Sequence, residues 1–287
     1  MATLSVITDG ISREFEHALD VMQEHGLSHA ELQHVWDREV GDLSDAQLER
    51  VSGMLRSRGM RVCCISRHIF GSLAVGECEP GVGAHADQLD ALRRCIAMAR
   101  ELDCRLVRIM SFRKEMILFG SGGAEQWNVA TGAWDRLKRL VAPAVQIAED
   151  AGVTLAVETG NNAMITSCRL GARLISELGS DSLKVLWDPG NSLYCAERPV
   201  PDGLTAVRDC LAHLHIKDLT VDIPGATVRQ VRFGDGQMAP YVKALAAGLR
   251  GIAYSGCVSL ESVYRPDGGT FEDGFRASFG RFAKVFG

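Results

Sequence analysis

Short apolar runs alternate with amphipathic stretches along the whole chain. Eight apolar runs predict strands at residues 3–8, 28–36, 61–66, 104–110, 153–158, 183–188, 211–218 and 257–261. Helical spacing of apolar residues predicts helices at residues 12–25, 44–59, 86–102, 134–151, 169–178, 207–211, 238–249 and 271–286. Strands that alternate with helices in this way are typical of βαβ units around a parallel sheet.

The length of the chain fits one barrel built from these units. A (β/α)8 barrel typically runs to about 250 residues, and this chain has 287 with no linker rich in Pro or Ser. We therefore expect an α/β fold, a single (β/α)8 TIM barrel that spans residues 1–287. Residues 71–83, 111–132 and 222–236 are predicted loops, and the loop at 111–132 is a candidate lid over a site.

Composition narrows the possible partners and the compartment. Hydrophobic residues make up 46% and charged residues 23% of the chain, as in ordinary globular proteins. A net charge of −5 without a long basic run argues against a nucleic-acid partner. No apolar run approaches the roughly 20 residues that span a bilayer, and no signal peptide is apparent. Nine cysteines without a C-x-x-C pair predict free thiols in a reducing cytoplasm.

Four predicted strands end in residues that can bind a metal ion, namely Glu158, Asp188, His215 and Glu261. Catalytic groups of a barrel gather at the carboxyl ends of its strands, so these side chains are expected to meet. Each residue alone has an ordinary explanation: a strand-end glutamate that pairs with arginine, an aspartate that forms a turn, a histidine in the core. Their occurrence on four successive strands favours a metal centre.

This set of ligands suits one divalent ion, with Mn²⁺ expected first and Mg²⁺, Co²⁺ or Zn²⁺ as alternatives. Such an ion can act as a Lewis acid on a substrate carbonyl and stabilise an enediolate. Glu158 and Glu261 end different strands, so they can flank the substrate and move a proton on or off the adjacent carbon.

Polar residues inside the apolar strands are further candidates. Arg108 is costly to bury unless it is paired, so it is expected to meet a carboxylate of the substrate or of the protein. Glu31 and Gln33, in the second predicted strand, either face the barrel interior or the substrate, or are polar residues that a strand end tolerates.

Candidate substrate contacts also lie just beyond the predicted strands. His68 follows the third strand, and Asn191 follows the sixth within the turn D-P-G-N. Lys217 alternates with the histidines of the seventh strand and therefore shares their face. Arg232, in the loop at 222–236, is a candidate for binding a carboxylate or a phosphate, or for facing only water.

The motifs AVETG, LWDPGN, HLHIKD and VSLES resemble the sugar phosphate isomerase/epimerase family of xylose isomerase-like TIM barrels. The resemblance implies that Glu158, Asp188, His215 and Glu261 bind a divalent metal. In the ketose 3-epimerase branch the two glutamates are the acid/base pair, which implies that role for Glu158 and Glu261. Asn191 stands where that branch usually has a histidine, and Lys217 stands near where it has an arginine.

These departures leave several functions open. The leading hypothesis is a metal-dependent isomerase or epimerase that acts on a ketose or related polyol carbonyl compound. A lyase or dehydratase of keto-inositol or dehydroshikimate type is the alternative, with Lys217 or His68 as the acid. A non-catalytic sugar-binding barrel is a third reading. Apurinic-site endonucleases share the fold but need further histidines. The expected partner is a small sugar or polyol, and related barrels often pair, which implies a homo-oligomer.

Overall fold

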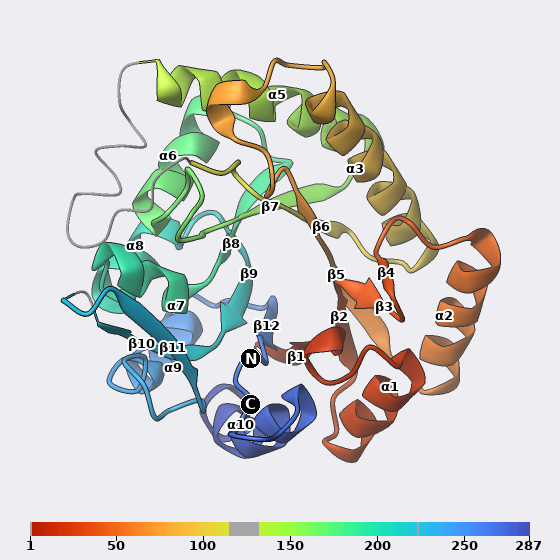
Figure 1. Cartoon of the computed structure of the whole chain (residues 1–287), viewed down its shortest axis with the longest axis vertical. Helices are drawn as coiled ribbons and strands as arrows, with labels where there is room; N and C mark the ends of the chain where they lie inside the picture. Colours follow the sequence, from red (N-terminus) through yellow and green to blue (C-terminus); the bar gives the residue numbers. More distant parts are fainter. Residues whose placement is uncertain (1, 115–131, 223) are drawn as a thin grey trace.

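Eight parallel strands close into a barrel in the computed structural model, which describes residues 2–114, 132–222 and 224–287 (Figure 1). Around the barrel the order is β1, β12, β9, β8, β7, β6, β5 and β2. The strands are β1 (Thr3–Ile7), β2 (His29–Leu32), β5 (Arg61–Ile69), β6 (Leu106–Ile109), β7 (Thr154–Glu158), β8 (Leu183–Trp187), β9 (Leu211–Ile216) and β12 (Cys257–Leu260). The predicted (β/α)8 TIM barrel is therefore confirmed.

Helices surround the strands on the outside of the barrel (Figure 1). The longer ones are α1 (Phe15–Glu24), α2 (Asp45–Ser57), α3 (Ala84–Glu101), α5 (Ala133–Ala151), α6 (Cys168–Leu178), α9 (Val242–Gly251) and α10 (Phe271–Phe286). The short helical segments are η1 (Thr8–Gly10), η2 (Val75–Glu77), α7 (Pro189–Ser192), η3 (Leu193–Cys195), η4 (Pro199–Gly203) and α8 (Leu204–Val207). The sequence sets their ends locally: Ser44 and Gln47 form the capping box predicted before α2.

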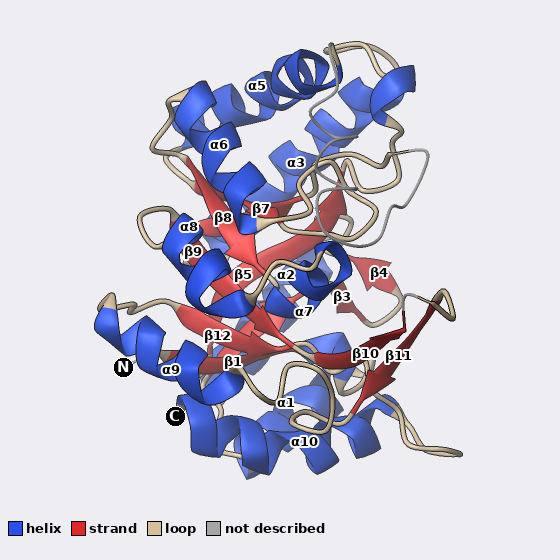
Figure 2. Cartoon of the chain, turned by 90° about the vertical axis from the view of Figure 1, so that its left-hand side faces the viewer, coloured by secondary structure: helices blue, strands red, loops and turns tan. Residues whose placement is uncertain are grey.

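Two antiparallel hairpins project from the end of the barrel toward which the strands run, whereas the C-terminus lies at the other end (Figure 2). They are β3 (His34–Val35) with β4 (Arg38–Glu39), and β10 (Asp218–Asp222) with β11 (Thr227–Val231). The second hairpin corrects the prediction of a loop over residues 222–236. Its strands contain β-branched residues on either side of the turn at Pro224–Gly225, which favours a hairpin.

Other boundaries also differ from the prediction. The third barrel strand was expected to end at Ser66, but β5 continues to Ile69 and includes His68. The helix predicted at 207–211 lies at 204–207, and the one predicted from Met238 begins at Val242. Most of the predicted lid at 111–132 lies outside the described residues.

The barrel has an apolar shell around a polar centre. Val6, Leu214 and Val258 belong to the shell, where strands pack against helices and remove apolar surface from water. The side chains that alternate with Leu214 on β9 are His213 and His215, and both are fully buried inside the barrel. The centre therefore holds ionisable groups that must pair with one another.

Candidate metal centre

Three of the four predicted ligands cluster at the carboxyl end of the barrel, and Asp188 lies next to them. Glu158 is the last residue of β7, His215 lies near the end of β9, and Asp188 and Glu261 follow β8 and β12. Ligand atoms of Glu158, His215 and Glu261 all lie within 4.8 Å of one another. The Lys217 ammonium links the fourth, since its Nζ lies 2.6 Å from Asp188 Oδ2 and 2.8 Å from Glu261 Oε2.

Asp188 is oriented by the turn that follows it. Its Oδ1 accepts hydrogen bonds from the backbone N–H groups of Gly190 (2.9 Å) and Asn191 (3.3 Å), so that it caps α7. Its Oδ2 is left to face the centre. Burial raises the pKa of Asp188 to about 7, although Lys217 opposes that shift.

Glu158 is held by Arg108, which is itself almost fully buried. Arg108 donates to Glu158 Oε2 at 3.0 Å, to Gln33 Oε1 at 3.2 Å and to the backbone carbonyl of Ser66. Arg108 thus meets a carboxylate of the protein, one of the two partners expected for it. Burial would raise the pKa of Glu158, but Arg108 and His215 outweigh burial and hold it below the ordinary value.

Glu31, on β2, orients His215 through hydrogen bonds inside the barrel. Its Oε1 lies 2.8 Å from His215 Nε2, and its Oε2 lies 2.8 Å from His213 Nε2. His215 Nδ1 consequently faces Glu158, with 3.3 Å between Nδ1 and Oε1. Burial alone would lower the pKa of His215, but Glu31 and Glu158 raise it to about 10. The sequence left the role of Glu31 open. A glutamate inside an apolar strand was its one signal.

The ligand atoms of Glu158, His215 and Glu261 form a possible site for a divalent cation. Asp188 Oδ2 and His215 Nδ1 are buried, and neither has a well-directed hydrogen bond within the part of the chain that the structure describes. Together with the oxygens of Glu158 and Glu261 they offer three carboxylates and one imidazole, a set that suits Mn²⁺, Mg²⁺, Co²⁺ or Zn²⁺. The Lys217 ammonium lies against two of these carboxylates.

The predicted substrate contacts divide into two groups. Arg108 and Lys217 lie in the centre, and Asn191 lies beside it, where its Nδ2 donates to the Thr159 carbonyl at 2.8 Å. His68 instead lies beside Glu39, with its ring Nδ1 3.9 Å from a carboxylate oxygen. Arg232 is ion-paired with Asp235 at 2.7 Å on the protein surface. Substrate binding by these residues stays a prediction.

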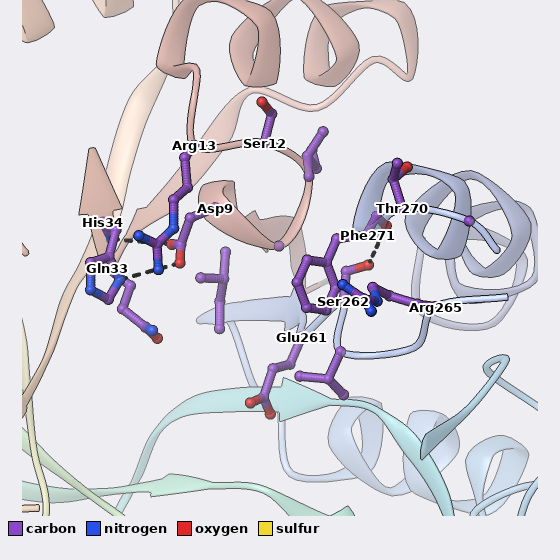
Figure 3. Close-up of a pocket in the computed structure, with 15 residues that line it drawn as sticks. Asp9, Ser12, Arg13, Gln33, His34, Glu261, Ser262, Arg265, Thr270 and Phe271 are labelled. Carbon is purple, nitrogen blue, oxygen red and sulfur yellow. Dashed lines mark hydrogen bonds and ion pairs between the residues drawn. The ribbon is translucent and has the colours of Figure 1, made fainter. Parts of the chain in front are cut away.

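A cavity of about 520 Å³, called here the side cavity, opens beside the centre. Figure 3 shows its walls, which come from the turn after β1, the end of β2 and the segment between β12 and α10. Glu261 and Gln33 line it, so it adjoins both the candidate ligands and Arg108. Sequence reasoning missed its basic residues, Arg13, His34 and Arg265, because they lie in loops and a short hairpin without a recognisable motif.

The fold and the centre define the class: a TIM barrel with carboxylates and a histidine at the carboxyl ends of its strands. The chain belongs to the xylose isomerase-like TIM barrel family, whose model matches residues 19–284. No curated protein matched the sequence of the chain significantly. Among the described residues, no helix is both long and apolar enough to cross a membrane.

Solved structures with this fold share little sequence identity with the chain. D-psicose 3-epimerase with D-fructose is 17% identical over 99% of both chains, with a TM-score of 0.73. The probable 3-DHS dehydratase of petrobactin synthesis from Bacillus anthracis is 13% identical over 96% of this chain and 97% of its own, with a TM-score of 0.73. A xylose isomerase-like TIM barrel protein from Mycobacterium smegmatis in complex with magnesium is 16% identical over 100% and 98%, with a TM-score of 0.67.

Proposed function

We propose that the protein is a divalent-metal-dependent isomerase or epimerase of a ketose or related polyol carbonyl compound. The observation that carries the proposal is the approach of Glu158, His215 and Glu261 ligand atoms to within 4.8 Å of one another, with Asp188 tied to Glu261 through Lys217. An epimerase and a magnesium complex among the structures of this fold support the reaction class and a divalent ion. We propose Mn²⁺ as the ion.

A bound ion would supply Lewis-acid polarisation of the substrate carbonyl. Glu158 and Glu261 approach from β7 and β12, which β8 and β9 separate, so they reach the substrate from different directions. Burial would raise the pKa of Glu261, but Lys217 outweighs it and holds that pKa below the ordinary value, as Arg108 does for Glu158. Both carboxylates are therefore ionised at neutral pH, and either can accept a carbon-bound proton. The other can return a proton to the opposite face once it has taken one up from water.

Deuterium exchange tests this proposal directly. Metal-loaded protein is incubated in deuterated water with a panel of ketoses, and recovered sugars are examined by mass spectrometry and NMR. A processed ketose should gain deuterium at the carbon next to the carbonyl. Glu158→Gln and Glu261→Gln should both stop the exchange. Glu16→Gln is the control, because Glu16 lies on α1 outside the barrel, where it pairs with Arg50 at 3.0 Å. A ketose that is converted without deuterium uptake contradicts the proposal.

The position of Lys217 favours a dehydratase as the second candidate. Its ammonium lies 2.8 Å from Glu261 Oε2, so a cationic acid stands beside a base. After Glu261 removes a proton, Lys217 can protonate a departing β-hydroxyl group. One solved structure with this fold is that of a probable 3-DHS dehydratase. Loss of water from the product, read as a mass change, distinguishes this reaction from isomerisation.

A further inference from the structure

The side cavity extends from the candidate metal centre to walls that carry two arginines. Figure 3 shows Arg13 entering from the turn after β1 and Arg265 from the segment after β12, with Glu261 in the adjoining wall. The cavity therefore offers space for a part of the substrate beyond the carbon that reacts at Glu261.

Arg265 is oriented by an aromatic ring and not by an acid. Its guanidinium carbon lies 5.0 Å from the centroid of the Phe271 ring. Phe271 is 41% exposed, one of two large hydrophobic residues exposed within the described ranges. No carboxylate among those residues lies within ion-pair distance of Arg265. A guanidinium stacked on a ring keeps the N–H donors at its edge free for a ligand.

Arg13, like Arg265, has no strong ion pair within the described residues. Its one ion pair in the described part of the chain is with Asp37, at 4.0 Å, and the Asp37 side chain is 97% exposed. Such an exposed ion pair is weak and does not compete strongly with a ligand for the Arg13 guanidinium.

The acids that line the same cavity already have cationic or hydrogen-bonding partners. Asp9 accepts from the His34 backbone N–H at 3.1 Å, and its other oxygen lies 3.3 Å from His34 Nδ1. Glu261 is neutralised by Lys217 at 2.8 Å. Arg13 and Arg265 are therefore the cationic groups of the cavity wall that are least engaged with acids, on a protein whose net charge is −5.

From this arrangement we infer that the side cavity binds an oxyanion of the substrate, a carboxylate or a phosphate, at the end remote from the reacting carbon. The carboxylates of the centre are already paired with Arg108 and Lys217, so an anionic group of a substrate would be held by the cations of the cavity wall, Arg13 and Arg265. Arg13 and Arg265 offer the planar donor arrays that bind carboxylate and phosphate oxygens in pairs. That the oxyanion belongs to the substrate rests on the proposed function, whereas the binding of an oxyanion does not.

Calorimetric titration tests the inference with two probes, inorganic phosphate and malonate, each added separately to Mn²⁺-loaded protein. The double variant Arg13→Gln/Arg265→Gln should bind the preferred probe at least about tenfold more weakly than the wild type, because two charge-assisted contacts are lost. Whichever probe binds more tightly identifies the oxyanion as a phosphate or a carboxylate. The affinity of the Arg265→Lys variant for the preferred probe should lie between those of the wild type and the double variant, since lysine keeps the charge but loses the planar donors.

Arg93→Gln is the matched control. Arg93 is 56% exposed, close to the 59% of Arg13, but it pairs with Asp90 outside the cavity, so its loss should change neither affinity. Equal binding by the wild type and the double variant, or no binding of either probe to the wild type, overturns the inference. Absence of deuterium exchange on every ketose would refute the proposed function alone, because these titrations measure binding without turnover.

Discussion

Replacing Glu31 with glutamine should weaken metal binding although Glu31 is not itself an expected ligand. Glu31 is fully buried, and its two oxygens lie 2.8 Å from the Nε2 atoms of His215 and His213. The carboxylate can accept a hydrogen bond from both rings at once, which leaves His215 Nδ1 free to bind an ion. The glutamine amide has one accepting oxygen and one NH₂ group, so it can accept from only one ring.

The expected loss of metal affinity can be estimated from other carboxylates that hydrogen-bond to ligating histidines. Carboxylates that orient ligating histidines typically change metal affinity 10–100-fold when removed, which is about 1.4–2.7 kcal/mol. Glu31→Gln should therefore raise the Kd for Mn²⁺ by about that factor, because it removes both the orientation of His215 and a nearby negative charge.

Titration of metal-free protein with Mn²⁺, followed by calorimetry or electron paramagnetic resonance, measures this Kd for the wild type and Glu31→Gln. Circular dichroism first establishes that the variant is folded. Glu39→Gln is the matched control, since Glu39 lies on β4 and should leave the Kd unchanged. A folded Glu31→Gln variant whose Kd stays within about twofold of the wild type would show that Glu31 does not orient the ligand.

Two further predictions concern proton release and the closing helix. His215 has a pKa of about 10, so it is an imidazolium at neutral pH, and it has to lose that proton to bind an ion. Mn²⁺ affinity should therefore rise with pH by up to about tenfold per unit, and titrations in buffers of different ionisation enthalpy should detect the released proton; affinity that is constant from pH 6 to 8 refutes this. Gly274→Ala in α10 should destabilise the protein by more than about 2 kcal/mol in denaturant unfolding, because its Cβ would overlap the Tyr264 carbonyl oxygen. Gly280→Ala, in the same helix with open space around it, should instead stabilise by about 0.5–1 kcal/mol, and equal effects of the two variants would contradict the steric explanation.

The fold was predictable because its signals are local and repeated. Alternation of apolar strands with amphipathic helices recurs along the chain, and each unit supports the same architecture. The hairpin β10–β11 was missed, since its turn at Pro224–Gly225 also suits an irregular loop. Strand ends were uncertain for a similar reason: Arg67 and His68 are polar, yet β5 continues through them to pair with β6.

The candidate ligands were predictable because strand ends of a parallel barrel meet in space. Glu158 and Glu261 are far apart in sequence, and topology alone brings them together. The side cavity could not be predicted in this way, because Arg13 and Arg265 lie in segments whose paths depend on tertiary packing. Sequence pattern therefore locates the candidate reaction centre, whereas the shape and charge of the adjoining cavity require coordinates.

The polar centre also shows that charged residues within apolar strands are informative sequence signals in a barrel of this kind. A buried ion is costly unless it is paired, so Arg108 and Glu158 are each tolerated only because the other is present. The same holds for Glu31 beneath His215, and for Lys217 between Asp188 and Glu261. A charged residue within an apolar strand thus implies a partner on another strand, even where no motif names it. Applied to Arg108, that reasoning leads to Glu158; applied to Glu31, it would have led to the histidines of β9.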